Sequence, residues 1–327
     1  MPKELEPSTN EKQFTLEALR QGLRLDGRDF DTFRPLKLSF GHEFGLADVQ
    51  LGKTRYNPCS AAPLPPFLSL SPQEEKSKAL SQKSKLRRVM ARVSADVVAP
   101  FSDRPFDGIF TITTELGPMA SPAFEVGRQT EQEVLLARLI EKSIRRSNAI
   151  DTESLCIVAG QKCWHVRADV HFLNHDGGLV DASCVAVVAA LQHFRRPDVS
   201  VHGEKVTVHT LVERVPVPLS ILHVPICVTF SYFGDAGGGI TVFDATLQEE
   251  QLREGDMTIT LNKFGEVCQI AKAGGLPIQA EALYRCMRKA LVKVEEITAF
   301  IAKVLKEDQD ERTRRDNLLE STAENER

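Results

Sequence analysis

The stretch from Asp181 to Phe194 limits the possible folds of this chain more than any other part of the sequence. It has the length of a helix, and nearly all of its side chains are apolar. A surface helix needs only one apolar stripe, so a helix that is apolar on all sides must be covered by other elements. A strand-like run from Val166 to Leu173 and an Asp-Gly-Gly turn precede it. We therefore predict a helix that is buried against a β-sheet.

Apolar periodicity assigns most of the remaining chain to strands and helices. Short apolar runs, or apolar residues at every second position, predict strands at 36–49, 89–98, 109–116, 155–158, 166–173, 206–215, 226–233, 240–244, 257–261 and 267–271. Apolar residues three or four positions apart predict helices at 11–22, 129–146 and 278–305. The result is an α+β fold, in which mixed β-sheets are flanked by helices in two packed units of one compact chain.

We expect three regions along the chain. Residues 12–220 form the first unit, residues 221–306 form the second, and residues 307–327 form a charged segment that is either a frayed helix or a tail. Residues 56–88 interrupt the first unit. They are rich in proline and then in Ser, Lys and Gln, and they show no sustained period. Such a segment cannot bury enough apolar surface to become ordered, so we predict a disordered insertion there.

Composition excludes several classes of protein. Hydrophobic residues make up 42% of the chain, yet no apolar run approaches the roughly 20 residues that cross a bilayer. The stretch from Met1 to Lys12 is polar and charged, so we expect no secretory signal. The seven cysteines form no CxxC pair, which predicts free thiols. The net charge of −4 does not indicate a basic nucleic-acid-binding domain, but it permits a local basic lining.

Several short motifs occur in the order in which a known family carries them. They are Arg24-Leu25-Asp26-Gly27-Arg28, Leu51-Gly52-Lys53-Thr54-Arg55, 127–133, 149–156, 175–178 and 193–197. The first resembles the R-x-D-G-R opening of RNase PH-type proteins, and the second resembles the bend of their first β-hairpin. The others resemble one branch of that family, the RNase PH-like subunits of the RNA exosome core ring. The resemblance runs from Lys12 to Lys306, apart from the insertion, and it implies the RNase PH fold.

The insertion has two interpretations. When residues 56–88 are removed, Arg55 is followed directly by Val89, as in the unbroken hairpin of the family. The segment is either an enlarged hairpin loop, which costs little because closure entropy grows slowly with length, or a translated intron retained in the gene sequence. The amino-acid sequence leaves both interpretations open.

The resemblance raises the question of catalysis. RNases that attack RNA with inorganic phosphate need cationic or hydrogen-bond donor groups on the phosphate and carboxylates near the scissile bond. Asp169 and Asp176 are present, but the apolar residues Leu179 and Val180 follow the Asp-Gly-Gly turn, which is also a common structural turn. We therefore predict that the chain is not an enzyme and has no catalytic residue, no metal site and no cofactor. The alternative is an active phosphate-dependent 3′–5′ exoribonuclease.

Four basic residues lie in predicted turns or before a helix. They are Arg104, Arg128, Lys53 and Arg55. In the relatives, basic residues in such loops face the channel of the ring and hold single-stranded RNA by its backbone, so the resemblance nominates these four as RNA-binding. Arg128 also precedes a predicted helix, whose N-terminus favours a phosphate. The alternative for each residue is a surface ion pair or simple solvation.

The resemblance also implies a biological role. It indicates a non-catalytic RNA-binding and scaffold subunit that supports 3′–5′ RNA processing and degradation, including rRNA maturation and mRNA turnover. The expected partners are the other RNase PH-like ring subunits, RNA-binding cap subunits and single-stranded RNA, and no membrane. The expected location is the nucleus and nucleolus, and also the cytoplasm.

Overall fold

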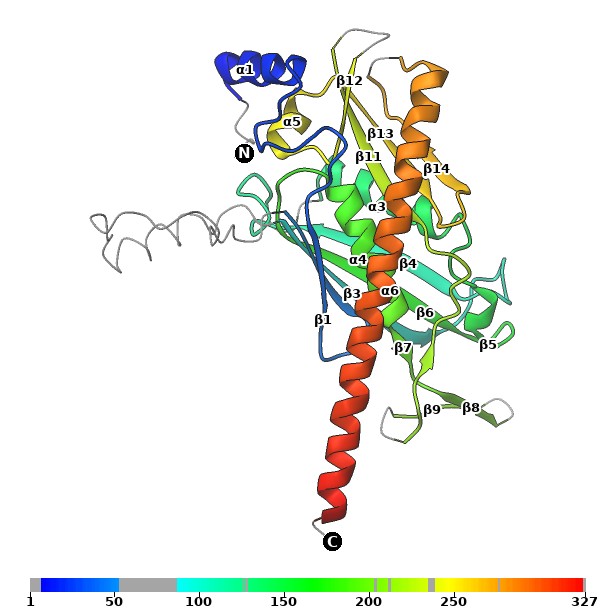
Figure 1. Ribbon diagram of the computed structural model, residues 1–327. Coiled ribbons are helices and arrows are strands. Elements are labelled where there is room, and N and C mark those ends of the chain that lie inside the picture. Colours follow the sequence, from blue (N-terminus) through cyan, green and yellow to red (C-terminus); the bar gives the residue numbers. More distant parts are fainter. Residues whose placement is uncertain are drawn as a thin grey trace, which may run out of the picture.

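Two β-sheets lie on either side of one buried helix in the computed structural model of the chain (Figure 1). The structure describes residues 7–52, 87–125, 127, 129–202, 205–210, 213–234, 239–275 and 277–325. The arrangement confirms the α+β fold with mixed sheets and flanking helices. It also gives the buried helix two covering sheets, where the sequence predicted one.

The first sheet has six strands in the order β1-β2-β3-β6-β4, with β5 paired to β6. These strands are β1 (Leu36–Phe40), β2 (Leu46–Leu51), β3 (Arg87–Val98), β4 (Ile109–Leu116), β5 (Cys156–Val158) and β6 (Lys162–Asn174). β4 runs parallel to β6, and the other pairs are antiparallel. Along β6, the buried Val166, Ala168 and Val170 alternate with more exposed residues, so one face of the sheet points to the core.

The second sheet is antiparallel, with the order β12-β11-β13-β14. Its strands are β11 (Ile226–Phe233), β12 (Ile240–Phe243), β13 (Gly255–Leu261) and β14 (Val267–Ala271). Between the sheets in sequence lie two short pairs, in which β7 (Arg195–Arg196) joins β10 (Val217–Pro218) and β8 (Val199–His202) joins β9 (Lys205–Val208). The strand predicted at 206–215 is therefore wrong in its second half, because β9 ends at Val208.

Helix α4 (Leu179–His193) lies between the two sheets and contacts β2, β3 and β6 on one side and β11 on the other. Every residue from Asp181 to Leu191 is buried. This explains the absence of a polar stripe in the sequence, since no side of the helix meets water. Helix α3 (Glu131–Ile144) packs beside it, against β4 and β14.

Helix α6 (Ala280–Asn325) begins on the second sheet and continues past the first (Figure 1). Beyond Lys306, the guanidinium of Arg312 donates to the backbone oxygens of Gly41 and His42, at 2.6 and 2.8 Å. The carboxylate of Asp308 accepts from Arg312 at 2.6 Å. Of the two expectations for residues 307–327, frayed helix or tail, the described residues 307–325 are helical and are tied to the β1–β2 turn at this point.

One hydrophobic cluster contains buried residues of both sheets and of α3, α4 and α6. A small second cluster joins Leu19 of α1 (Thr9–Arg20) to Phe233 and Val242 of the second sheet. The N-terminal helix, which the sequence placed in the first unit, thus packs on the second sheet. The boundary at residue 220 stays a prediction, and it falls between the last strand of the first sheet and the first strand of the second. No helix among the described residues combines the length and the apolar character that spanning a membrane requires.

The chain segment predicted as an insertion connects two adjacent antiparallel strands. Leu51 of β2 pairs with Arg87 of β3, and Gln50 pairs with Arg88. Residues 53–86 lie outside the described residues, but Arg87 and Arg88 belong to β3. The predicted insertion at 56–88 is therefore two residues too long at its C-terminal end, because strand pairing orders those residues.

We predict that deletion of residues 56–86 preserves the fold. Leu51 and Arg87 are already neighbours across the hairpin, and a shorter connection costs less closure entropy, which raises the free energy of unfolding by up to about 2 kcal/mol. Chemical denaturation of the two proteins measures the change. As a control, deletion of 56–90 also removes the buried Val89 and destabilises the protein. A large loss of stability in the shorter deletion contradicts the loop interpretation.

Mass spectrometry of the endogenous protein separates the loop from the retained intron. Peptides from residues 60–76 are expected if the segment is a translated loop. A peptide that joins Arg55 directly to Val89 is expected if the segment is an intron.

Candidate functional site

The strand register brings several motif-bearing segments to one end of the first sheet. Leu51 pairs with Arg87, Arg88 pairs with Asn174, and Leu116 pairs with Phe172. The β2–β3 connection, the turn after β6 and the segment after β4 therefore leave the sheet at the same end. The amide N–H of His175 donates to the carbonyl oxygen of Ala120 at 3.1 Å and joins two of these segments.

Arg104 lies at the opposite end of the sheet. It belongs to the turn between β3 and β4, and the first residue of β4, Ile109, pairs with His165 near the start of β6. The side chain of Arg104 is exposed, and no described carboxylate lies within ion-pair distance of it. The turn itself is anchored by amide N–H donation from Gly160 to the oxygen of Pro105, at 2.9 Å.

Of the four predicted RNA-binding residues, the structure places Arg104. The segments that carry Lys53, Arg55 and Arg128 start from the end of the sheet far from Arg104. These three residues themselves lie outside the described part of the chain. Their proposed contacts stay predictions from the sequence.

The Asp-Gly-Gly turn is shaped by a close approach to the second sheet. Gly177 and Gly178 have positive φ angles of 80° and 54°. A Cβ atom on Gly177 would lie 2.6 Å from the oxygen of Ala245 and 2.7 Å from the amide nitrogen of Leu247. Only glycine fits this contact, so the sequence motif is needed for packing.

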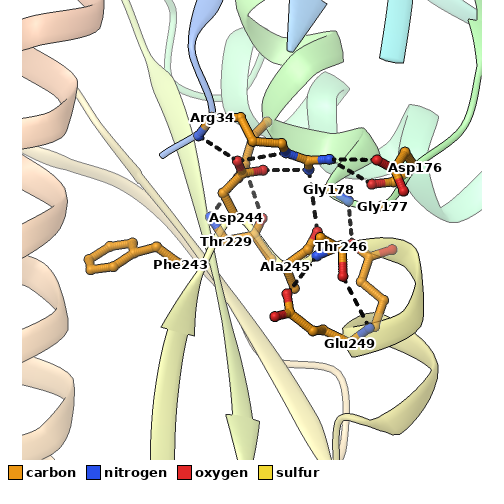
Figure 2. A network of polar contacts seen from close by, with 12 residues as sticks. Arg34, Asp176, Gly177, Gly178, Thr229, Phe243, Asp244, Ala245, Thr246 and Glu249 are labelled. Atoms are coloured by element: carbon orange, nitrogen blue, oxygen red, sulfur yellow. Dashed lines mark hydrogen bonds and ion pairs between the residues drawn. The ribbon is translucent and has the colours of Figure 1, made fainter. Parts of the chain in front are cut away.

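A buried ion pair joins this turn to both sheets (Figure 2). The guanidinium of Arg34 donates to both carboxylate oxygens of Asp244, at 2.8 and 2.7 Å, and the amide N–H of Arg34 donates to one of them at 2.9 Å. Arg34 also donates to the backbone oxygen of Asp176 at 2.8 Å and lies 3.4 Å from its carboxylate. Burial alone would lower the pKa of Arg34, but the hydrogen bond and charge of Asp244 raise it above its ordinary value. Arg34 is therefore charged, and each nitrogen of its guanidinium already donates to an oxygen of the chain.

The R-x-D-G-R motif holds the same loop of the second sheet. Arg24 donates to both oxygens of Glu249, at 3.0 and 2.7 Å, and to the backbone oxygens of Phe243 and Asp244. Arg28 lies 3.2 Å from the carboxylate of Asp244. Sequence reasoning identified the motif but not these acceptors, which lie more than two hundred positions further along the chain. The motif is thus explained by contacts between the start of the chain and the second sheet.

The N-terminus of α4 would be the natural place for an anion beside the Asp-Gly-Gly turn. There, the amide N–H of Gly178 donates to the carboxylate of Glu250, from α5 (Leu247–Leu252). Leu179 and Val180 are half-buried and pack against the core. Asp181 is buried and accepts from the hydroxyl of Thr229 at 2.7 Å. A phosphate at this site would compete with the chain's own carboxylate.

The carboxylates named in the sequence are engaged elsewhere. Asp169 accepts from the guanidinium of Arg167 at 3.0 Å, on the sheet face away from α4. Asp176 faces Arg34. Within the described ranges, no group of three or more His, Cys, Asp or Glu side chains could hold a metal ion. The contacts of these side chains therefore indicate a structural role, in packing and ion pairing, at this end of the first sheet.

Comparison with known proteins adds a family to this geometry. Residues 83–197 match domain 1 of a 3′ exoribonuclease family of RNase PH type, and residues 223–293 match domain 2. The Exosome complex component rrp45 of Schizosaccharomyces pombe is 51% identical over all of both chains. The Exosome complex component RRP45 of Saccharomyces cerevisiae is 48% identical over 100% of this chain and 99% of its own length.

Comparison with solved structures identifies the same fold. A chain of the Archaeoglobus fulgidus exosome, described with RNA bound to the active site, superposes with a TM-score of 0.68 and 26% identity, over 89% of this chain and 97% of its own. A chain of another archaeal exosome core superposes with a TM-score of 0.64 and 23% identity, which supports the fold.

We predict that Asp244→Ala lowers the free energy of unfolding by about 3–5 kcal/mol, because it leaves the buried guanidinium of Arg34 without its carboxylate. Denaturant titration gives this value. The matched control is Asp31→Ala, which removes a carboxylate that is 56% exposed and pairs with Lys289 at 2.6 Å. We expect the control to cost less than about 1 kcal/mol. Equal effects of the two substitutions contradict the role of Asp244.

Proposed function

Because this chain belongs to the RNase PH-type 3′ exoribonuclease family and, within it, to the group of exosome components named RRP45, we propose that it is a non-catalytic scaffold and RNA-binding subunit of the RNA exosome ring. In this role it supports 3′–5′ RNA processing and degradation, including rRNA maturation and mRNA turnover. The main observation against catalysis is that the amide N–H of Gly178, at the N-terminus of α4, already donates to the carboxylate of Glu250.

Three features argue against phosphorolysis at the Asp-Gly-Gly turn. Glu250 places a negative charge where an attacking phosphate would need positive charge, and like charges at this distance repel. The side chains of Leu179 and Val180 offer no hydrogen-bond donor. Arg34, the nearby guanidinium, is bound on both sides by Asp244 and Asp176 and is not available to a substrate. The alternative, an active phosphate-dependent exoribonuclease, would require these contacts to break.

Arg104 is the first candidate for a contact with RNA. Its side chain is exposed in a turn that is fixed by backbone hydrogen bonds, and no described carboxylate neutralises it. Positive charge on an anchored turn loses little conformational freedom when it meets a phosphate. Lys53, Arg55 and Arg128 are further candidates from the sequence.

The partners follow from the family. Neighbouring RNase PH-like subunits complete the ring, and RNA-binding cap subunits and single-stranded RNA are the other proposed partners. The Archaeoglobus fulgidus exosome, whose fold this chain shares, is described with bound RNA. The proposed compartments are the nucleus, the nucleolus and the cytoplasm, where RNA processing and turnover take place.

We predict that the purified chain releases no nucleoside diphosphate from poly(A) in the presence of phosphate and Mg²⁺. Chromatography of the products measures release. Phosphate-dependent release that Asp176→Ala abolishes would overturn the non-catalytic assignment. Trace release that Asp176→Ala leaves unchanged indicates a contaminating RNase, and an Asp169→Asn variant provides a second check on this point.

We predict that Arg104→Glu weakens RNA binding of the assembled ring without dissociating it. Loss of one phosphate contact on a single strand lowers the slope of log K against log salt by about 0.7. The matched control is Arg138→Glu, an exposed arginine on α3 that already has a carboxylate neighbour, Glu141, at 3.3 Å. Gel filtration checks that the ring is intact. Equal slopes for the Arg104 variant and wild type would remove Arg104 from the RNA path.

A further inference from the structure

Two cysteines face each other across the hairpin that supports the Arg104 turn. Cys156 of β5 and Cys163 of β6 are direct partners in the antiparallel register. Directly opposed residues in such a pair have Cα atoms about 4.5–5.5 Å apart. This separation lies inside the range of about 4.4–6.8 Å that a disulfide bond requires. The backbone therefore already has the spacing for a bond between them.

Both thiols also point toward the same neighbouring segment, which shows that they share a face. The Sγ atom of Cys156 lies 4.0 Å from the carbonyl oxygen of Pro105. The thiol of Cys163 interacts with the backbone of Ile109, four residues further on. Cys163 is fully buried, whereas Cys156 is half-buried, so only Cys156 can meet a reagent from solution directly.

A groove leads to Cys156 from the surface. Its volume is about 230 Å³, and its walls include Cys156, Trp164, Arg196 and Asp198. The guanidinium of Arg196 donates to the oxygen of Ser154 at 3.0 Å, and no described carboxylate lies within ion-pair distance of it. Asp198, by contrast, is paired with Arg214 at 2.8 Å. The groove therefore places the guanidinium of Arg196 among the residues that surround Cys156, and this positive charge favours an anionic reagent.

From this geometry we propose that Cys156 and Cys163 form a reversible cross-strand disulfide, and that the groove admits a small anionic disulfide such as glutathione disulfide as the oxidant. This site adjoins the Arg104 turn through Pro105, but the proposed disulfide does not depend on the proposed function.

The exchange takes place in two steps. The thiolate of Cys156 attacks one sulfur of glutathione disulfide, so that a mixed disulfide forms and one glutathione thiolate leaves. The thiolate of Cys163 then attacks the sulfur of Cys156, which forms the Cys156–Cys163 bond and releases the second glutathione thiolate. The two protein thiols lose their protons to the released thiolates. In total, two thiols and one glutathione disulfide give one protein disulfide and two molecules of reduced glutathione. Burial raises the pKa of Cys163, so the second step is the slower one and accelerates as the pH rises.

The full-length protein, reduced and then incubated with glutathione disulfide without denaturant, tests the proposal. After alkylation, trypsin cuts behind Lys162 and separates peptide 147–162, with Cys156, from peptide 163–167, with Cys163. We expect a linked pair of these peptides that dithiothreitol separates again. The result that overturns the proposal is alkylation of both peptides, or glutathione retained on Cys156 as the stable product.

Two variants sharpen the test. Cys163→Ser removes only the second thiol, so we expect glutathione to stay on Cys156. Arg196→Gln should slow bond formation several-fold with glutathione disulfide but not with the neutral hydroxyethyl disulfide, and Arg196→Lys should restore the rate. Equal rates with both reagents contradict the role of the groove charge. The matched control is Cys268→Ser on β14, which should leave the linked peptides unchanged.

Discussion

The buried carboxylate of Asp244 receives hydrogen bonds from Arg34 and lies within ion-pair distance of Arg28, so charges from the beginning of the chain meet a charge from the second sheet. A carboxylate in such a position is tolerated only when its partners are present, because desolvation of an unpaired charge costs several kcal/mol. The pair therefore does more than add stability. It fixes the distance between the Asp-Gly-Gly turn and the second sheet, and through α5 it places Glu250 at the N-terminus of α4.

The same contacts support the proposal that the chain is not catalytic. The elements that could bind phosphate are all present: a helix N-terminus, two glycines with positive φ and an arginine. Each of them already has an internal partner. These groups form a junction that holds the two sheets together. The proposed loss of catalysis requires no distortion of the fold, only that these charged and polar groups pair with one another.

The sequence predicted most of the fold because its strongest signals are local. The apolar helix, the strand periods and the apolar stripe of the helix at 129–146 can be recognised within a few neighbouring residues. The acceptors of Arg24 and Arg34 could not be predicted, since nothing near Asp244 or Glu249 marks them as partners of residues two hundred positions away. The position of the Arg104 turn at the end of the first sheet opposite the Asp-Gly-Gly turn was also hidden, because it depends on the parallel pairing of β4 with β6. The helix beyond Lys306 is stabilised by charged pairs four residues apart, such as Asp308 with Arg312, which an analysis of apolar period cannot detect.

The path of α6 has a consequence for synthesis of the protein on the ribosome. The last helix covers residues around the first strand and reaches the β1–β2 turn through Arg312. The first sheet can pair its strands early, and Phe40 of β1 can stack on His193 of α4, but β1 gains the cover of α6 only after that helix has left the exit tunnel. Contacts between the two extremes of a sequence make folding slow and leave apolar surface open to aggregation in the meantime. Packing of α6 on β1 is therefore a late step of folding, and before it a chaperone or a ring neighbour has the opportunity to bind β1.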